Sequence, residues 1–324
     1  MGAAYSIIGA VVGIIFGAGT GAVVWQLKDI LPKDILPHRS IEGTTITVVN
    51  GMQGLPQANL SGVELYGAND TSRFLDGQYA YLPDFGSHTF PALENPNYIY
   101  ITNAGPEPVC IAGIEVRFPT GKGVGISGNL GVTCGLATYE SGKSVLPEPY
   151  DKAGEACVWV DGHGSNGIYQ HGLIFDITPV TQDPDKFKVQ EPEDLCKAPF
   201  TNPVPELEQA LVERSETSPV TGGFSTQLVK SNLENTGAVV RLCEGKTNIG
   251  PDFASLSERL YCDMDSREIH PFCEENTRGV CFDVDQDALL EMDGEASIAE
   301  VGGDQARASE GKVVKSFKQV QVWD

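Results

Sequence analysis

Basic residues are scarce in this sequence. Its 324 residues include 22 lysines and arginines against 44 aspartates and glutamates, which gives a formal net charge of −22 at pH 7. A surface this acidic repels the phosphates of nucleic acids and the headgroups of anionic lipids. The composition therefore argues against a nucleic-acid partner.

Recognisable catalytic motifs are also lacking. The sequence contains no P-loop, no dinucleotide-binding GxGxxG that opens a helix and no GxSxG nucleophile elbow. No two cysteines have CxxC spacing and the histidines are dispersed, which argues against a structural zinc site. We therefore predict a protein that is not an enzyme and that carries no cofactor and no metal.

Turn-forming residues, by contrast, are abundant, with 37 glycines and 20 prolines. Between them lie short runs of β-branched and aromatic residues, at 44–49, 98–102, 109–118, 156–160 and 172–177. Such runs, separated by turns every 8–12 residues or so, are typical of antiparallel sandwiches. The sequence predicts a mainly β fold, an antiparallel β-sandwich or jelly-roll-like ectodomain.

The eight cysteines indicate an oxidising compartment, because an even number without metal-ligand spacing fits four disulfides. We expect the last four to pair among themselves, and the remaining connectivity stays open. Two sequons, at Asn59 and Asn69, are compatible with a glycoprotein of the secretory route. The predicted disulfide cysteines are Cys110, Cys134, Cys157, Cys196, Cys243, Cys262, Cys273 and Cys281.

Residues 3–27 contain no charged side chain, and a helix of about 20 residues is long enough to cross a bilayer. We predict a hydrophobic N-terminal helix that meets a membrane. Small residues at every fourth position form a glycine zipper on which another helix could pack. These predicted helix-packing residues are Gly9, Gly13, Gly17 and Gly21.

Four outcomes stay open for this segment. It could be a signal peptide cleaved after Ala22. It could also be an uncleaved membrane anchor, but Lys28 and Lys33 follow it, and such basic flanks normally stay cytoplasmic, which argues against an external C-terminal domain. Gly2 and Ser6 fit an N-myristoylation pattern, which would make the segment an acylated, membrane-active one. A buried helix of a soluble protein is the fourth outcome, disfavoured by its many glycines.

The chain divides by composition. Residues 28–42 contain a repeated KDILP and are predicted to form a stiff stalk, while acids and prolines enrich residues 183–241, where only 205–216 has a helical pattern. The alternating run at 317–323 predicts a closing strand that pairs with the main sheet. The predicted parts are a hydrophobic segment (1–27), the stalk (28–42), a β-sandwich domain (43–182), a partly ordered connection (183–241) and a disulfide-rich segment packing on the β domain (242–324).

Two groups of residues are candidates for binding. Trp159, Asp161 and His163 could bind a glycan, with sugar CH groups on the indole and hydroxyls on the carboxylate, but a tryptophan between two valines is more typical of a core. The acids of residues 283–287 alternate as in a calcium loop, but the glycine and the glutamate that such a loop requires are replaced. We expect a solvated acidic loop there.

Several short motifs resemble a family of uncharacterised secreted or surface proteins of filamentous fungi. The segments that carry the resemblance are CIAGIEV (110–116), GNLG (128–131), CG (134–135), CVWVD (157–161), LC (242–243), GPDF (250–253), YCDM (261–264), PFC (271–273) and VQVW (320–323). Leu130 stands where that family has an aromatic residue. The resemblance implies secretion or surface display and no established reaction.

These observations together predict a non-enzymatic, secreted or membrane-tethered fungal protein with an external C-terminal domain. Its β ectodomain would act in wall, surface or host contact, with a glycan or a surface protein as partner and the membrane met through the N-terminal segment. The alternatives are a membrane-active protein whose glycine-striped helix oligomerises in bilayers, and a carbohydrate-active enzyme whose paired carboxylates the sequence does not reveal.

Overall fold

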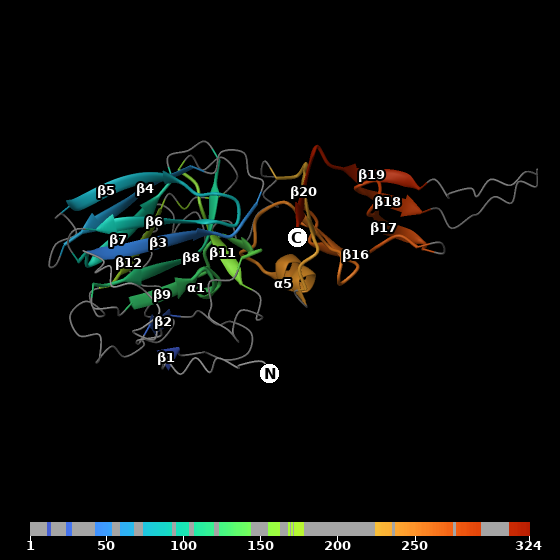
Figure 1. Cartoon of the computed structure of the whole chain (residues 1–324). Coiled ribbons are helices and arrows are strands. Elements are labelled where there is room, and N and C mark those ends of the chain that lie inside the picture. The colour runs from blue at the N-terminus through green and yellow to red at the C-terminus, as the bar shows by residue number, and fades with distance from the viewer. Residues whose placement is uncertain are drawn as a thin grey trace, which may run out of the picture. The chain divides into compact units, whose positions relative to one another are not determined.

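The computed structural model divides the chain into two compact units, Met1–Ser218 and Pro219–Asp324. It describes residues 12–13, 24–27, 43–53, 59–67, 74–92, 95–103, 107–119, 123–143, 155–162, 168, 170, 172–177, 224–234, 237–274, 277–292 and 311–324. Both units are mainly β, which confirms the predicted fold class (Figure 1).

An eight-stranded antiparallel sheet dominates the first unit. Its central path runs β1-β2-β9-β8-β11-β10, and β3 pairs with the other edge of β8 and with β6. The strands are β1 (Val12–Gly13), β2 (Val24–Leu27), β3 (Thr44–Asn50), β6 (Ser87–Ala92), β8 (Val109–Arg117), β9 (Gly123–Ser127), β10 (Thr138–Glu140) and β11 (Ala156–Val160).

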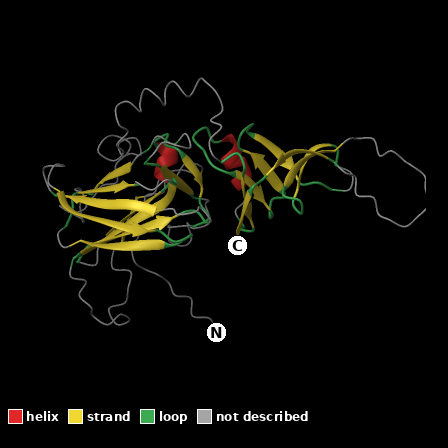
Figure 2. Cartoon of the chain, turned by 90° about the horizontal axis from the view of Figure 1, so that it is seen from above, coloured by secondary structure: helices red, strands yellow, loops and turns green. Residues whose placement is uncertain are grey.

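A second antiparallel sheet of the first unit has four strands in the order β12-β7-β4-β5. They are β4 (Asn59–Tyr66), β5 (Phe74–Tyr81), β7 (Tyr98–Thr102) and β12 (Gly172–Asp176). Side chains of β12 and of β8, β9 and β11 line one common cavity, so the two sheets face each other as the layers of a sandwich (Figure 2). Buried and half-buried residues alternate along β3 and β7, as expected for strands with one face in a core.

Along one of its edges, strand β8 pairs with two different strands in turn. Its first half pairs with β11 and its second half with β9. A short helix, α1 (Asn129–Thr133), follows β9 in the chain and packs against β11, and the side chain of Asn129 accepts a hydrogen bond from the amide of Ala156 at 2.7 Å. A Cβ atom on the preceding Gly128 would lie 2.2 Å from the carbonyl oxygen of Ala156, so only glycine fits at this junction.

The second unit is built on a five-stranded sheet in the order β16-β15-β14-β13-β20. Strand β13 runs parallel to both β14 and β20, and the other pairs are antiparallel. Helix α5 (Ala238–Glu244) connects β13 to β14 and packs on β14, β15 and β16. The strands are β13 (Gln227–Ser231), β14 (Asp252–Ser255), β15 (Leu260–Asp263), β16 (Glu268–Pro271) and β20 (Gln319–Trp323).

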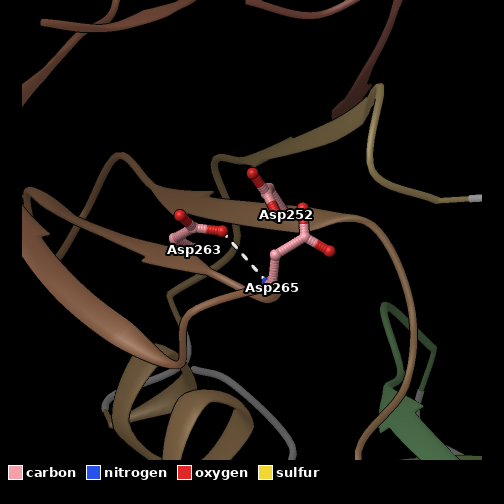
Figure 3. A group of neighbouring side chains, drawn as sticks. All are labelled: Asp252, Asp263 and Asp265. Atoms are coloured by element: carbon pink, nitrogen blue, oxygen red, sulfur yellow. Dashed lines mark hydrogen bonds between the residues drawn. The ribbon is translucent and has the colours of Figure 1, made fainter. Parts of the chain in front are cut away.

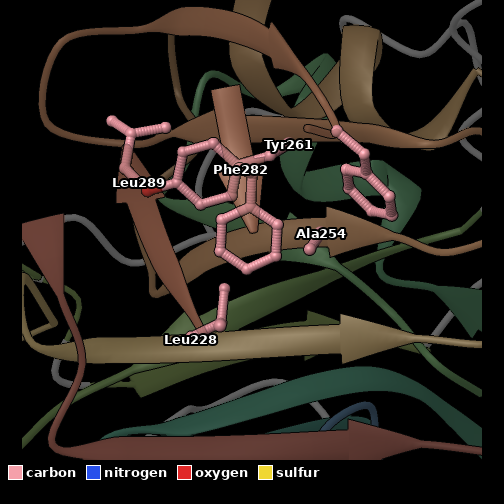
Figure 4. Packing of buried hydrophobic residues seen from close by; sticks show 6 residues of the cluster. Leu228, Ala254, Tyr261, Phe282 and Leu289 are labelled. Atoms are coloured by element: carbon pink, nitrogen blue, oxygen red, sulfur yellow. The ribbon is translucent and has the colours of Figure 1, made fainter. Parts of the chain in front are cut away.

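A three-stranded antiparallel sheet completes this unit, with β17 (Gly279–Asp283), β18 (Ala288–Met292) and β19 (Lys312–Ser316) in chain order. Aromatic and aliphatic side chains of the two sheets form one hydrophobic cluster (Figure 4). Within it the rings of Tyr261 and Phe282 stack with centroids 4.6 Å apart. The buried members of the cluster are Leu228, Ala254, Tyr261, Phe272, Phe282 and Leu289.

Two expectations about the chain's organisation are wrong. The closing strand, β20, pairs with β13 in the second unit and not with the main sheet. Residues 224–231, assigned by composition to a partly ordered connection, include β13, which lies between β14 and β20 in the second unit's sheet. The composition of this acidic, proline-rich stretch did not reveal β13, because a strand of five residues changes the average composition too little.

Other expectations fall outside the described residues. The stalk at 28–42 and the helix at 205–216 lie there entirely. The hydrophobic helix predicted within 1–27 lies there as well, except for β1 and β2, which are strands; β2 pairs with β9.

Candidate functional site

The disulfides occur in both units. Cys110 and Cys157 join the neighbouring strands β8 and β11, and both side chains are fully buried. In the second unit Cys243 of α5 bonds to Cys262 of β15, and Cys273 bonds to Cys281 of β17. These last two bonds confirm that the four C-terminal cysteines pair among themselves. Cys134 is also disulfide-bonded, and Cys196 lies outside the described residues.

Two of the three residues proposed for glycan contact are in the interior. Trp159 and Asp161 have no exposed surface, and the indole packs beside Tyr139 with ring centroids 6.2 Å apart. A sugar cannot stack on an indole that solvent does not reach, so Trp159 is a core residue beside the Cys110–Cys157 disulfide. His163 lies outside the described residues.

The structure describes only some of the predicted helix-packing glycines and glycosylation sites. Gly13 belongs to β1, whereas Gly9, Gly17 and Gly21 lie outside the described residues. Asn59 opens β4, opposite Tyr81 of β5, and Asn69 lies outside the described residues. The glycine zipper and the glycosylation of these sequons stay predictions.

The acidic run at 283–287 is a hairpin turn between β17 and β18. The carboxylate of Asp283 accepts hydrogen bonds from the amides of Asp285 and Gln286, both at 2.9 Å, which closes the turn. Asp287 forms an ion pair with Lys230 of β13 at 2.6 Å. Two of the alternating acids therefore have partners within the unit, and the turn also connects the three-stranded sheet to the larger one.

Three carboxylates of the second unit surround the ammonium of Lys315 in β19. Its ammonium nitrogen lies 2.7 Å from a carboxylate oxygen of Asp252, 2.7 Å from Asp263 and 2.9 Å from Asp265. The three acids come from the start of β14, the end of β15 and the turn after it, and each offers an oxygen within 4.8 Å of the others (Figure 3). We call these four residues the Lys315 cluster. Among the described residues, this is the one group with the spacing of a metal site.

The local hairpins explain how the acids converge. Asp263 is the last residue of β15, and its carboxylate accepts a hydrogen bond from the amide of Asp265 at 3.0 Å, which folds the turn back toward the strand. The turn ends at Arg267, which has a positive φ of 62°, and β16 follows. Strand β19 then places Lys315 over these carboxylates, about 50 residues later in the chain.

Asp252 is the buried member of the cluster, with only 1% of its side chain exposed. The amide of Met264 donates to its Oδ1 at 2.9 Å, and the hydroxyl of Tyr261 donates to its Oδ2. Burial raises the pKa of Asp252 to about 6, although Lys315 and Tyr261 act in the opposite direction. The carboxyl is therefore poised to take up a proton in mildly acidic solution.

The other members respond differently. Burial alone would raise the pKa of Asp263, but the hydrogen bond and charge of Lys315 hold it below its ordinary value. Burial alone would lower the pKa of Lys315, but the three carboxylates raise it. Burial and the charge of Asp252 raise the pKa of Tyr261, which keeps its hydroxyl protonated as a donor. The cluster is thus held together by a lysine that stays positively charged and a tyrosine hydroxyl that stays protonated.

The arrangement suits structural cross-linking better than catalysis or metal binding. Lys315 occupies the centre of the three carboxylates, the position that a divalent ion would take. The phenol and a backbone amide use the remaining oxygens of Asp252. The cluster therefore ties β19 to β14 and β15 through its own charges.

The first unit contains a small apolar cavity between its two sheets. Leu130, Leu136, Val158, Leu173 and Phe175 contribute to its lining, and its volume is about 20 Å³. That is room for about one water molecule and not for an organic ligand. Leu130 of α1 borders it.

Comparison with known proteins found no matching family model, no matching curated protein and no matching solved structure. Among the described residues, no helix combines the length and the hydropathy needed to span a membrane. Three disulfides fit an oxidising extracellular or secretory environment.

Proposed function

We propose that this chain is a non-enzymatic, secreted or membrane-tethered fungal surface protein, which acts through the exterior of its disulfide-stabilised β ectodomain in wall, surface or host contact. The observation that carries the proposal is the oxidised state of every described cysteine, in both units. Disulfides of this number persist outside the reducing cytosol.

The interior chemistry supports a binding or structural role. The tryptophan that suggested a glycan site is a core residue. The carboxylates that gather around Lys315 are occupied by that ammonium, and the described cavity is too small for a substrate. What the described residues offer to a partner is therefore their outer surface, and the chain as a whole is strongly acidic, with a net charge of −22.

The proposal is tested by locating the protein in the cells that produce it. Intact cells are treated with a membrane-impermeant biotin reagent, and the culture medium and cell fractions are analysed by mass spectrometry. We expect the chain in the medium or among the biotinylated surface proteins. An N-terminus near Val23 would identify secretion with cleavage, and an intact N-terminal segment would identify a tether.

A chain with both sequons removed, Asn59→Gln with Asn69→Gln, serves as the matched control for the route. A mass difference between wild type and this variant that glycosidase treatment abolishes would place the wild type in the secretory pathway. Recovery of unbiotinylated, unglycosylated protein in the cytosolic fraction alone would overturn the proposal.

A further inference from the structure

The charges of the Lys315 cluster do not balance at neutral pH. Three carboxylates surround a single ammonium, so the ionised cluster has two more negative than positive charges. Like charges at this separation raise the free energy of one another's ionised forms, most of all away from water. A bound proton would remove part of this excess.

The structure identifies which carboxylate takes that proton. Asp263 and Asp265 are 14% and 35% exposed, so water screens part of their charge, whereas Asp252 is 1% exposed. Asp252 also lies against the aromatic cluster through Tyr261, whose ring stacks on Phe282. A desolvated carboxylate has the most to gain from neutralisation.

We propose that Asp252 is a proton-binding site that makes the C-terminal unit more stable in mildly acidic than in neutral surroundings. Protonation requires no rearrangement of the strands. Lys315 keeps its bonds to Asp263 and Asp265, Oδ1 of Asp252 keeps the amide of Met264, and the hydroxyl of Tyr261 can rotate to accept from the new acid proton.

The direction of the effect follows from linkage. The pKa of Asp252 is about 6 in the folded chain and 3.8 in its ordinary state, so between these values the native state binds more protons than the unfolded state. Stability is therefore highest below the lower value and is lost as the pH rises through about 6. Asp263, whose folded pKa is lowered, acts in the opposite direction but only as the pH falls toward and below 3.8.

Other charged groups of the neighbouring elements do not compensate Asp252. Arg267 attracts Asp265, but it donates to the carbonyl oxygens of Leu242 and Asn248. On the same face Lys230 of β13 is paired with Asp287, and His270 of β16 lies near Glu268. On the opposite face, α5 carries Arg241 and Glu244, both exposed.

Thermal unfolding of the full chain at pH about 7.5 and at pH about 5 tests the proposal. We expect the transition of the C-terminal unit to move upward by several degrees in acid, with a gain of about tenfold in the folding equilibrium constant, because pH 5 lies one unit below the folded pKa of about 6 and each unit is a factor of ten. The variant Asp252→Asn should lose most of this acid gain. Asp285→Asn, which removes an exposed acid of the β17–β18 turn, should retain it and so controls for the general loss of negative charge.

Two results would overturn the proposal. One is an acid gain of equal size in Asp252→Asn and Asp285→Asn. The other, which needs no variant to fold, comes from a carboxyl NMR titration of the wild-type chain: Asp252 is expected to titrate with a pKa of about 6, and titration at or below its ordinary value of 3.8 would exclude it as the proton-binding group.

Discussion

Replacing Lys315 by methionine is expected to lower the free energy of unfolding of the C-terminal unit by about 3–5 kcal/mol, the cost typical of breaking a buried charge group by removing one partner. Methionine keeps an unbranched apolar side chain but leaves three carboxylates within 4.8 Å of one another without a cation. The change also removes a bridge between the two sheets of this unit. Denaturant unfolding followed by circular dichroism measures the loss.

Lys312 of the same strand provides the matched control. Its side chain is 77% exposed and its ammonium nitrogen lies 3.6 Å from a carboxylate oxygen of Glu291, so the pair is screened by water. Lys312→Met should change stability by less than about 1 kcal/mol. Equal effects of the two substitutions would show that Lys315 is an ordinary surface lysine and would contradict the structural role of the cluster. Mild acid should restore part of the stability of Lys315→Met, since protonation relieves the repulsion among the carboxylates.

The second large effect concerns the disulfide at the centre of the sandwich. Replacing Cys110 and Cys157 together by alanine should destabilise the first unit by about 4 kcal/mol, because the bond closes a loop with a sequence separation of 47. Both side chains are fully buried, so the core next to Trp159 loses packing as well. The free energy of unfolding of the first unit measures this.

The Cys273–Cys281 bond is the control, because its sequence separation is only 8. The same dependence on loop length predicts a loss of about 2.5 kcal/mol in the second unit when both of its cysteines become alanine. If the short-loop bond proved to contribute more than the long-loop bond, chain entropy and core burial would not explain how this fold is stabilised.

The strands of the first unit could be predicted because their signal is local. In β3 and β7 alternate residues are buried, and residues 44–49 and 98–102 show this alternation in the sequence itself. The pairing of the four C-terminal cysteines could also be expected, since they lie close together in the chain. Helix α1 could not, because the GNLG segment has the composition of a turn and forms a helix where it follows β9 and packs against β11.

The organisation of the second unit depends on contacts that the sequence does not display. Strand β13 pairs with β20, about 90 residues later, and α5 is a helix of seven residues with two adjacent valines, which has little helical signal of its own. The Lys315 cluster combines β14, β15 and β19, whose acids and lysine look like ordinary surface charges. Asp252 lies in the GPDF motif and Asp263 in the YCDM motif, but neither pattern is specific for a group of charges.

The redox state of the cysteines in protein isolated from its own source tests most directly whether disulfides stabilise this chain outside the cytosol. The protein is unfolded in denaturant with a thiol-alkylating reagent present and no reductant, and labelled cysteines are counted by mass spectrometry. We expect no labelled cysteine before reduction and all eight after it. Eight labelled cysteines before reduction would contradict both the disulfide-stabilised fold and the extracytoplasmic location.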